Sequence, residues 1–316
     1  MTAAPPRVLV TCPPMLGMID AFRNRFARAG VDLDAAHVVQ TLSEEALIAR
    51  LPGVDGWIIG DDPATARVLE AGAAGRLKAA VKWGVGTDNV DFAAARRLGL
   101  DCTNTPGVFG REVADIAMHY VTALARHTVA IDRAIRQDAA WPKPRGLSLA
   151  GRTVALVGFG DIGRQTARRL LAAEMRVLAY DPAFAAQPGL DVTPARWPER
   201  LDEADFLVFT CPLTETTHHL FDRALIERLK PGVRVVNVGR GPVIATDALV
   251  AALERGVVHS AALDVFEHEP LAADAALRRF DACVFGSHNA SNTADAVDRV
   301  SHQAIDTLFG YLGIDG

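Results

Sequence analysis

The sequence predicts an α/β protein built from two doubly wound parallel sheets. Short runs rich in valine, isoleucine and leucine alternate with longer segments of helical period, and glycine or proline marks the joints. This alternation occurs twice along 316 residues, a length that suits about two domains of ordinary size. In the second series a glycine-rich turn directly follows the first strand. Strands that alternate with helices form parallel sheets covered on both faces.

The first series runs from the N-terminal region to residue 103. Gly30 and Gly99 directly follow two of its helical segments, as expected for residues that end a helix in the left-handed conformation. The predicted strands are Val8–Thr11, Gly56–Ile59, Leu77–Lys82 and Leu100–Thr103. The predicted helices are Met18–Ala29, Ser43–Leu51, Ala64–Ala71 and Phe92–Leu98.

A long helix over Glu112–His127 is predicted to form the hinge into the second series. Its apolar face is broader than packing within one domain needs, and a loop-rich arm containing Trp141 follows it up to Gly151. These two features predict a homodimer built mainly through the second domain. The strands of the second series are Thr153–Val157, Arg176–Tyr180, Phe206–Thr210, Arg234–Val238, Ala261–Val265 and Cys283–Phe285. Its helices are Arg164–Glu174, Asp222–Leu229 and Asp247–Arg255.

Composition excludes several classes of partner. Lys and Arg number 33 against 38 Asp and Glu, a net charge of -5 without a long basic run, so no nucleic-acid partner is expected. No apolar run approaches the roughly 20 residues of a membrane span, and no secretory signal is recognised. The four cysteines lie far apart without metal-ligand spacing, so we expect no metal site and reduced thiols in a cytoplasmic protein.

The glycine-rich turn predicts a dinucleotide site. Gly158 permits a tight turn, Gly160 lets the backbone approach a pyrophosphate, and Gly163 allows the helix to pack closely on the strand. The other residues of the turn are Phe159, Asp161 and Ile162. The helix start then offers unpaired N–H groups to the phosphates.

An acidic residue identifies the preferred dinucleotide. Asp181 ends the next strand, eighteen residues after Gly163 (181 minus 163), where a carboxylate should accept the hydroxyls of the adenine ribose. A carboxylate there would repel the 2′-phosphate of NADP. The sequence therefore predicts NAD as the cofactor.

Charged residues follow three later strands, within Asn237–Gly241, Leu263–Pro270 and Gly286–Asn289. Because the carboxyl ends of parallel strands share one edge of a sheet, all three segments should converge on one site. Hydride transfer to a 2-keto acid needs a cation for the carboxylate, an acid for the carbonyl oxygen and a partner that keeps this acid charged. An arginine, a histidine and a glutamate supply these roles.

At this point the sequence closely resembles the D-isomer-specific 2-hydroxyacid dehydrogenases, the family of D-3-phosphoglycerate, D-lactate, D-glycerate and formate dehydrogenases. The resemblance runs nearly end to end. Besides the glycine turn and the three strand ends, its motifs are Gly84–Asp91, Asn104–Gly107, Glu112–Asp115 and Pro212–Leu220.

The resemblance implies roles for individual residues. Arg240, Glu269 and His288 would be the catalytic three, with Glu269 hydrogen-bonded to the His288 ring and favouring its charged form. Val85 and Gly86 would offer backbone N–H groups to the substrate carboxylate. The cofactor would also contact Thr210, Cys211, Pro212, Val238, Gly239 and Asp264.

The family also implies a division of the chain. Residues 1–102 and 290–316 would form a discontinuous, flavodoxin-like substrate domain, and residues 103–289 a Rossmann domain for NAD, with a cleft between them. Glu267, His268, His218 and His219 are interpreted as solvated or structural residues.

The substrate is less well defined than the chemistry. Phosphoglycerate enzymes tend to carry basic residues after the strand that ends at Gly60, whereas this chain has Asp61 and Asp62 there. We therefore expect hydroxypyruvate or glyoxylate rather than a phosphorylated acid, although Lys82 is a candidate contact to an anionic group. D-3-phosphoglycerate dehydrogenase is the alternative, and an NAD-sensing corepressor is a remote one. Pro242 departs from the usual small residue without touching the catalytic three.

Overall fold

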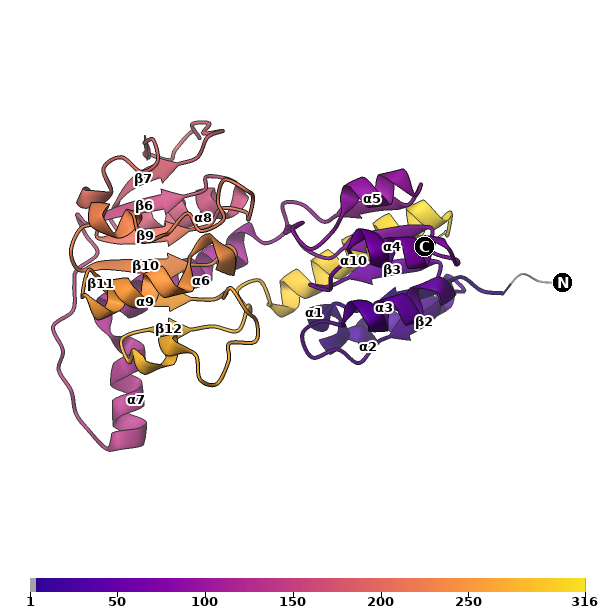
Figure 1. Cartoon of the computed structure of the whole chain (residues 1–316), viewed down its shortest axis with the longest axis horizontal. Coiled ribbons are helices and arrows are strands. Elements are labelled where there is room, and N and C mark those ends of the chain that lie inside the picture. Colours follow the sequence, from indigo (N-terminus) through magenta and orange to yellow (C-terminus); the bar gives the residue numbers. More distant parts are fainter. Residues whose placement is uncertain (1–3, 316) are drawn as a thin grey trace. The chain divides into compact units, whose positions relative to one another are not determined.

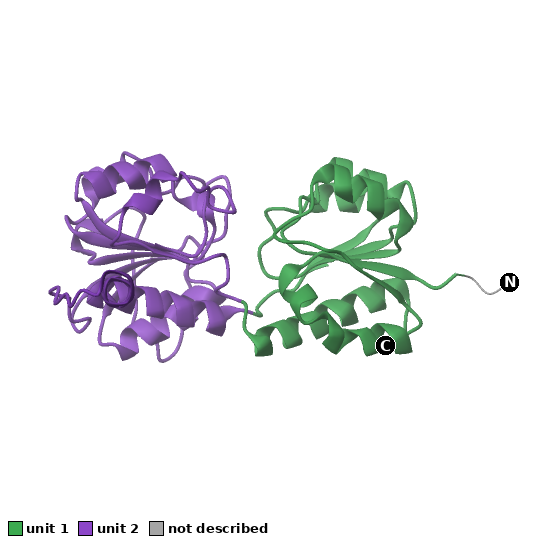
Figure 2. Cartoon of the chain, turned by 90° about the horizontal axis from the view of Figure 1, so that it is seen from below, with its two compact units in different colours: residues 1–108, 292–316 green, residues 109–291 purple. Residues whose placement is uncertain are grey.

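The computed structural model describes residues 4–315, which form two compact units (Figure 2). Unit 1 combines the chain up to Val108 with the segment from Asn292 onward, and unit 2 comprises Phe109–Ser291. In each unit a parallel sheet lies between layers of helices, as Figure 2 shows. The predicted fold class, two doubly wound parallel sheets, is therefore confirmed.

Unit 1 contains a five-stranded sheet in the order β2-β1-β3-β4-β5, which is the flavodoxin-like order. All of its pairs are parallel. The strands are β1 (Arg7–Val10), β2 (Asp32–Ala35), β3 (Gly56–Ile59), β4 (Ala79–Lys82) and β5 (Asp101–Asn104). Strand β2 was not predicted because it is an edge strand with two aspartates and no fully buried residue.

The helices of unit 1 begin with side-chain caps at four places. Ser43, Thr65, Asp91 and Thr293 each accept the N–H three residues on. The helices are α1 (Pro13–Gly17), α2 (Ile19–Arg28), α3 (Glu44–Arg50), α4 (Ala66–Ala73), α5 (Phe92–Arg97) and α10 (Ala294–Leu312), with a 3-10 turn at Leu51–Gly53. Although it comes last in the chain, α10 packs on β3 and β4 (Figure 1).

Unit 2 contains a seven-stranded sheet in the order β12-β11-β10-β9-β6-β7-β8, again with parallel pairs throughout. The strands are β6 (Thr153–Val157), β7 (Arg176–Tyr180), β8 (Thr193–Pro194), β9 (Phe206–Phe209), β10 (Val233–Asn237), β11 (Val258–Leu263) and β12 (Val284–Phe285). Six neighbouring strands, in the order β8-β7-β6-β9-β10-β11, have the strand order of a dinucleotide-binding sheet. Six of these strands were predicted, and the seventh, β8, has only two exposed residues.

The helices of unit 2 differ from the prediction at two places. They are α6 (Gly110–Arg126), α7 (Thr128–Asp138), α8 (Asp161–Ala172) and α9 (Thr246–Glu254), with 3-10 turns at Leu201–Glu203, Leu225–Arg228, Gly241–Val243 and Ala276–Arg279. The predicted helix Asp222–Leu229 is wrong, because only the four-residue 3-10 turn forms before Pro231. The predicted loop-rich arm begins instead with α7.

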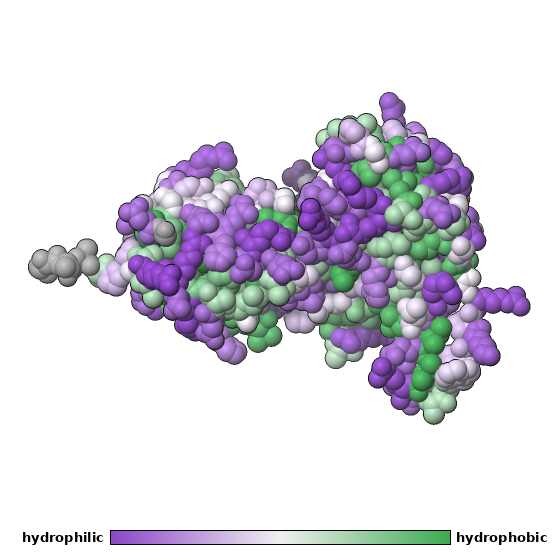
Figure 3. Space-filling model, turned by 180° about the vertical axis from the view of Figure 1, so that it is seen from behind, coloured by the Kyte–Doolittle hydropathy of each residue, from purple (hydrophilic) through white to green (hydrophobic). Residues whose placement is uncertain are grey.

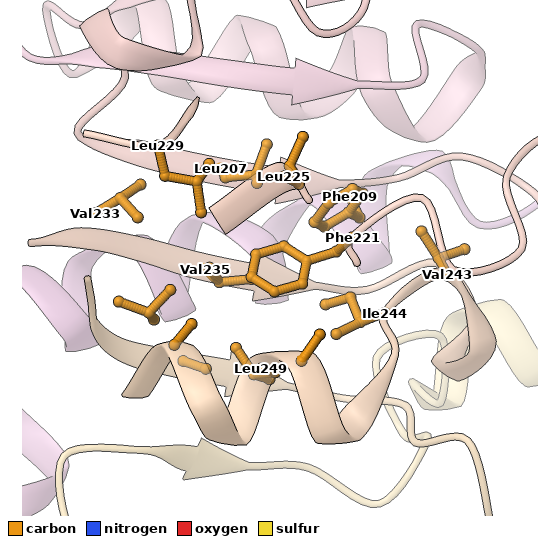
Figure 4. Packing of buried hydrophobic residues seen from close by; sticks show 14 of the residues in the cluster. Leu207, Phe209, Phe221, Leu225, Leu229, Val233, Val235, Val243, Ile244 and Leu249 are labelled. Atoms are coloured by element: carbon orange, nitrogen blue, oxygen red, sulfur yellow. The ribbon is translucent and has the colours of Figure 1, made fainter. Parts of the chain in front are cut away.

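The core of unit 2 fixes the loops that follow its strands. In Figure 4, Leu207, Phe209 and Val235 from β9 and β10 pack with Phe221 and with Leu249 of α9 in one buried cluster. Phe221 belongs to a loop rather than to an element of the sheet, and it is fully buried. Its burial anchors the segment between β9 and β10 on the sheet.

The arm from α7 to Gly151 is exposed along most of its length. None of the eleven residues of α7 is buried, while Ile135 is 42% and Trp141 77% exposed. Hydrophobic side chains accordingly show among hydrophilic ones on the arm at the lower right of Figure 3. An apolar surface of this kind is typical of a segment that contacts a partner.

Candidate active site

The predicted site residues of unit 2 lie at one edge of its sheet. Every strand pair is parallel, so the segments that follow β6, β7, β9, β10, β11 and β12 emerge together at the carboxyl edge. Gly158, Asp181, Thr210, Val238, Asp264 and His288 all stand in these segments. In open α/β sheets this edge is where ligands bind.

The glycine turn has the geometry that a dinucleotide requires. Gly158 has φ +93°, and a Cβ there would lie 2.7 Å from the Cys211 nitrogen. A Cβ on Gly163 would lie 2.2 Å from the Gly158 oxygen, so the helix start and the turn touch directly. A Cβ on Gly160 would meet nothing within 4 Å. The space beside Gly160, at the N-terminus of α8, therefore suits a pyrophosphate.

Asp181 lines a pocket of about 650 Å³ between the ends of β6, β7 and β9. Its carboxylate accepts the Phe159 N–H at 2.6 Å and the Ala183 N–H at 2.8 Å, which fix its orientation beside the turn. The pocket is also lined by Trp197, Pro212 and Arg196. Arg196 was not singled out from the sequence, because it follows Asp181 only after an irregular segment.

Thr210 and Cys211 support the same turn. The Thr210 hydroxyl donates to the Val157 and Gly158 carbonyl oxygens at 3.1 and 2.9 Å. Burial raises the pKa of the Cys211 thiol to about 12. Cys211 is therefore a protonated packing residue at neutral pH rather than a nucleophile.

His288 and Glu269 form a hydrogen-bonded pair. His288 Nδ1 lies 2.8 Å from Glu269 Oε2, and the two side chains are 24% and 21% exposed. The other oxygen, Glu269 Oε1, accepts the Phe266 N–H at 2.9 Å. The backbone of His288 is left-handed, with φ +55°. This pair matches a histidine acid held and oriented by a carboxylate.

Arg240 follows β10 in a turn that touches the segment carrying Glu269. A Cβ on Gly241 would lie 1.8 Å from the Phe266 oxygen, so only glycine fits at this contact. Asn237 Nδ2 donates to the Arg240 oxygen at 2.9 Å, and Arg240 Nη1 donates to the Gly239 oxygen at 3.0 Å. The turn after β10 is thus held against the loop that carries Glu269.

Asp264 supports the segment that carries His288. Its side chain is buried and accepts the Ala290 N–H at 2.9 Å and the Tyr120 hydroxyl at 3.3 Å. The Asp264 carbonyl accepts the His288 N–H at 2.7 Å. Asp264 therefore faces into the protein, and Tyr120 from α6 was missed as its partner.

In unit 1 the predicted substrate residues are Lys82, the last residue of β4, and Val85 and Gly86 in the loop that follows it. Lys82 is 3% exposed, and its Nζ donates to Asp61 Oδ1 at 3.0 Å and to the Trp83 oxygen at 3.2 Å. Asn104 Nδ2 donates to the Val85 oxygen at 3.2 Å, which orders the loop of Val85 and Gly86. Trp83 is buried and donates to the Ser301 hydroxyl of α10 at 3.1 Å.

The expectation that both Asp61 and Asp62 would face an anionic substrate is wrong for Asp62. Asp62 is fully buried, and its carboxylate accepts the Thr11 hydroxyl and the N–H groups of Leu42 and Gly60. These bonds tie two loops to the end of β1. Only Asp61, bound to Lys82, retains an exposed side chain.

Two general properties concern the described residues as a whole. None of the helices within residues 4–315 is long and apolar enough to cross a membrane. In the same part of the chain, no cluster of three histidine, cysteine or acidic side chains has the arrangement of a metal site.

Comparison with known proteins agrees with a dinucleotide-binding dehydrogenase. Residues 118–290 match the NAD binding domain of the D-isomer specific 2-hydroxyacid dehydrogenases. The chain is 36% identical over 280 residues to a hydroxypyruvate reductase of Thermotoga maritima, covering 86% of this chain and 90% of that protein. It is 33% identical to D-3-phosphoglycerate dehydrogenase 2, chloroplastic, of Arabidopsis thaliana, covering 98% of this chain but 49% of that protein.

A solved structure supports the same assignment. The crystal structure of a Thermus thermophilus protein matches with a TM-score of 0.85 and 32% identity, covering 97% of both chains. The chain belongs to the D-isomer-specific 2-hydroxyacid dehydrogenase family. It is an NAD-dependent dehydrogenase that acts on the CH–OH group of a 2-hydroxy acid, or on the corresponding 2-keto acid in reverse.

Proposed function

We propose that the protein reduces a small unphosphorylated 2-keto acid, hydroxypyruvate or glyoxylate, with NADH. The observation that carries this proposal is the 2.8 Å bond between His288 Nδ1 and Glu269 Oε2 at the carboxyl edge of the unit 2 sheet. In the proposed mechanism Nε2, the opposite ring nitrogen, would donate the proton to the substrate. The similarity to a hydroxypyruvate reductase supports the choice of substrate.

The proposed mechanism assigns one task to each catalytic residue. NADH, when bound, supplies the hydride that adds to the carbonyl carbon. His288, as the imidazolium, donates its proton to the carbonyl oxygen, so that the keto group becomes a hydroxyl. Glu269 stabilises the charge on the ring, and Arg240 binds the substrate carboxylate in the bidentate geometry that lysine lacks.

We propose that unit 1 is the substrate domain. Val85 and Gly86 would donate backbone N–H groups to the substrate carboxylate, and Lys82 would add positive charge beneath that loop. Asp61 offsets this charge, because its carboxylate lies 3.0 Å from Lys82 Nζ. A doubly charged phosphate should gain little from a lysine that is already paired.

The second candidate, a D-3-phosphoglycerate dehydrogenase, is favoured by the similarity to the Arabidopsis enzyme. A panel of hydroxypyruvate, glyoxylate, pyruvate and 3-phosphohydroxypyruvate with NADH separates the two, with rates read at the nicotinamide absorbance. We expect the highest kcat/KM for an unphosphorylated acid. A higher value for 3-phosphohydroxypyruvate would favour the second candidate, and no turnover of any of the four would refute both.

We propose further that the protein is a homodimer of the cytoplasm. The exposed arm with Ile135 and Trp141 supports the dimer, because it offers a surface for a partner contact. The four free cysteines support the cytoplasm, whose reducing conditions keep thiols unpaired. Sedimentation at micromolar concentration tests the dimer. Trp141→Ser should weaken self-association, whereas a monomeric wild-type protein would refute the proposal.

A further inference from the structure

The carboxylate of Glu267 joins three segments of unit 2 beside the proposed catalytic residues. Oε1 accepts a hydrogen bond from His219 Nε2 at 2.7 Å, and Oε2 accepts the Thr246 N–H at 2.6 Å. The Glu267 side chain is 22% exposed. Both oxygens are thus engaged by groups from other segments, which agrees with the interpretation of Glu267 as a structural residue.

The hydrogen bond from the Thr246 N–H to Glu267 caps the N-terminus of α9. Thr246 is the first residue of this helix, and the preceding Ala245 provides no side-chain cap. Burial alone would raise the pKa of Glu267, but the hydrogen bonds from Thr246 and His219 outweigh it and lower the pKa below its ordinary value of 4.5. The carboxylate is therefore charged at neutral pH and interacts favourably with the positive end of α9.

The bond to His219 fixes a second segment. His219 has a left-handed backbone with φ +50°, and its N–H donates to the Pro242 oxygen at 2.8 Å. Phe221 then pairs with the chain at Val243 and Ala245 through two backbone hydrogen bonds. The segment 214–221 is consequently attached to the turn that follows Arg240. Thr214, Thr216, Thr217 and Leu220 of this segment line the pocket beside Asp181.

The third segment is the loop of Glu267 itself, which also carries Glu269. It packs on the Arg240 turn at Gly241, where a Cβ would lie 1.8 Å from the Phe266 oxygen. The Phe266 N–H in turn donates to Glu269 Oε1. A displacement at Glu267 would therefore reach both Arg240 and the pair of Glu269 and His288.

We propose that Glu267, through His219 and Thr246, is a positioning residue that sets the place of Arg240 relative to the Glu269–His288 pair. This proposal rests on the proposed function. Glu267 would touch neither substrate nor cofactor. Misplacement of reacting groups by about 1 Å can lower a rate about a hundredfold, so loss of one of these bonds should be visible in turnover.

The test compares Glu267→Gln with Glu254→Gln, which removes an exposed charge from the end of α9. In the glutamine side chain an NH2 group replaces one of the two acceptor oxygens, so one of the two hydrogen bonds is lost. We expect Glu267→Gln to lower kcat/KM for the keto acid by roughly tenfold to a hundredfold, through both kcat and KM. Because segment 214–221 also lines the pocket beside Asp181, the Kd of NADH, from nicotinamide fluorescence, should rise by a smaller factor than kcat/KM falls, and Glu254→Gln should match the wild type.

A histidine pair provides a second, independent comparison. His219→Asn should lower kcat/KM, whereas His218→Asn should have a smaller effect, because the exposed His218 side chain contacts the His219 ring, at 3.9 Å between centroids, without sharing its hydrogen bond to Glu267. In the double variant His219→Asn/Glu267→Gln the loss should be smaller than the sum of the two single losses, because both changes act on the same group of contacts. Additive losses, or an unchanged kcat/KM in His219→Asn and Glu267→Gln, would overturn the proposal.

A third variant separates positioning from helix capping. Ala245→Ser supplies α9 with its own cap and should restore part of the Tm lost in Glu267→Gln. If Glu267 positions the catalytic loops, kcat stays low in this double variant. Full recovery of kcat together with Tm would mean that capping alone explains the effect. If the wild type itself reduces no 2-keto acid, the proposed function fails instead.

Discussion

The two units carry an aspartate at the same place in their sheets. In unit 1, Asp55 directly precedes β3, which pairs with the first strand, β1. In unit 2, Asp205 directly precedes β9, which pairs with the first strand, β6. Asp55 accepts the N–H of Arg7 at the start of β1 and binds Arg76 at 2.6 Å. Asp205 accepts the N–H of Thr153 at the start of β6 and binds Lys230 at 2.8 Å. At the amino edge of each sheet, an aspartate therefore links the starts of two neighbouring strands and binds a basic side chain.

At the carboxyl edges the two units differ. Asp62 in unit 1 is fully buried, with its carboxylate bound by groups of its own unit. Glu269 and His288 in unit 2 are also paired, yet each retains about a fifth to a quarter of its side-chain exposure. The enclosed Asp62 can therefore only hold loops together, whereas the partly exposed pair of Glu269 and His288 can be reached by a substrate.

The largest expected effect tests this difference at the unit 2 edge. His288→Ala should lower kcat by about 10²–10⁴-fold, because it removes the proton donor. Its Tm should stay close to that of the wild type, since the side chain is partly exposed. Steady-state rates and thermal unfolding measure both. A variant that retains more than about a tenth of the wild-type kcat would exclude His288 as the acid.

Glu269→Gln sharpens the same assignment through pH. A neutral amide no longer stabilises the imidazolium, so activity in the reduction direction should persist at low pH and be lost earlier as pH rises. The measurement is the alkaline limb of kcat/KM. An unmoved limb would show that Glu269 is not the partner that controls the charge of His288.

The next effect concerns the aspartates at the amino edges of the two sheets. Asp205→Asn should lower the free energy of unfolding by about 2 kcal/mol at neutral pH, because it breaks a half-buried charged network. Asp55→Asn should act similarly in unit 1. Neither should change kcat per folded molecule. Chemical denaturation gives the stabilities, and a much larger loss for only one of the two would break the analogy.

The pH dependence of Asp205 has a definite sign. Burial alone would raise the pKa of Asp205, but the hydrogen bonds from Lys230 and Thr153 outweigh it and hold the pKa below 3.8. Its stabilisation is therefore fully present above pH 3.8 and is lost as the pH falls through the lowered pKa. The stability difference between the wild type and Asp205→Asn should shrink on acidification.

Sequence patterns predicted the bounds of an element correctly where an apolar run was continuous and clear turn residues lay on both sides. Strands β3, β6 and β7 were predicted at the bounds that the structure shows, because apolar runs lie between clear turn residues. The edge strands β2 and β8 carry no such pattern. Helix α7 was missed because it lies in the exposed arm after α6 and none of its residues is buried, so its apolar residues give no core-facing pattern.

Within the site, the sequence indicated which residues lie at the sheet edge but not which way they face. Asp61 and Asp62 are neighbours of one type, yet one binds Lys82 near the surface and the other is enclosed. Similarly, Glu267 and Glu269 are two residues apart and bind different histidines. Such choices depend on contacts between distant segments, which a single sequence does not reveal.

A smaller effect concerns cofactor choice at the unit 2 edge. NADH should be preferred over NADPH by at least about tenfold, roughly 1.4 kcal/mol, because Asp181 would repel a 2′-phosphate. Asp181→Ala should shrink this ratio, and Arg196 in the same pocket should then assist NADPH. The double variant Asp181→Ala/Arg196→Ala tests the second part. Equal use of both cofactors by the wild type would contradict the role of Asp181.

The smallest effect is expected for Asp62→Asn, and it has the opposite pH sign to Asp205. Burial raises the pKa of Asp62 above 3.8, only partly opposed by hydrogen bonds from Leu42 and Thr11.

The folded state of the wild type therefore holds this proton more tightly than the unfolded state. Its contribution is most favourable below pH 3.8 and declines as the pH rises through the raised pKa. The amide in Asp62→Asn does not titrate. Its NH2 group, however, takes the place of one carboxylate oxygen and would face the Gly60 N–H, which is also a donor. At neutral pH these effects should nearly offset each other, leaving the variant within about 1 kcal/mol of the wild type. Denaturation curves from pH 4 to 8 test this, since a wild-type advantage that grows with pH would mean that the Asp62 carboxylate stabilises unit 1 as Asp205 stabilises unit 2.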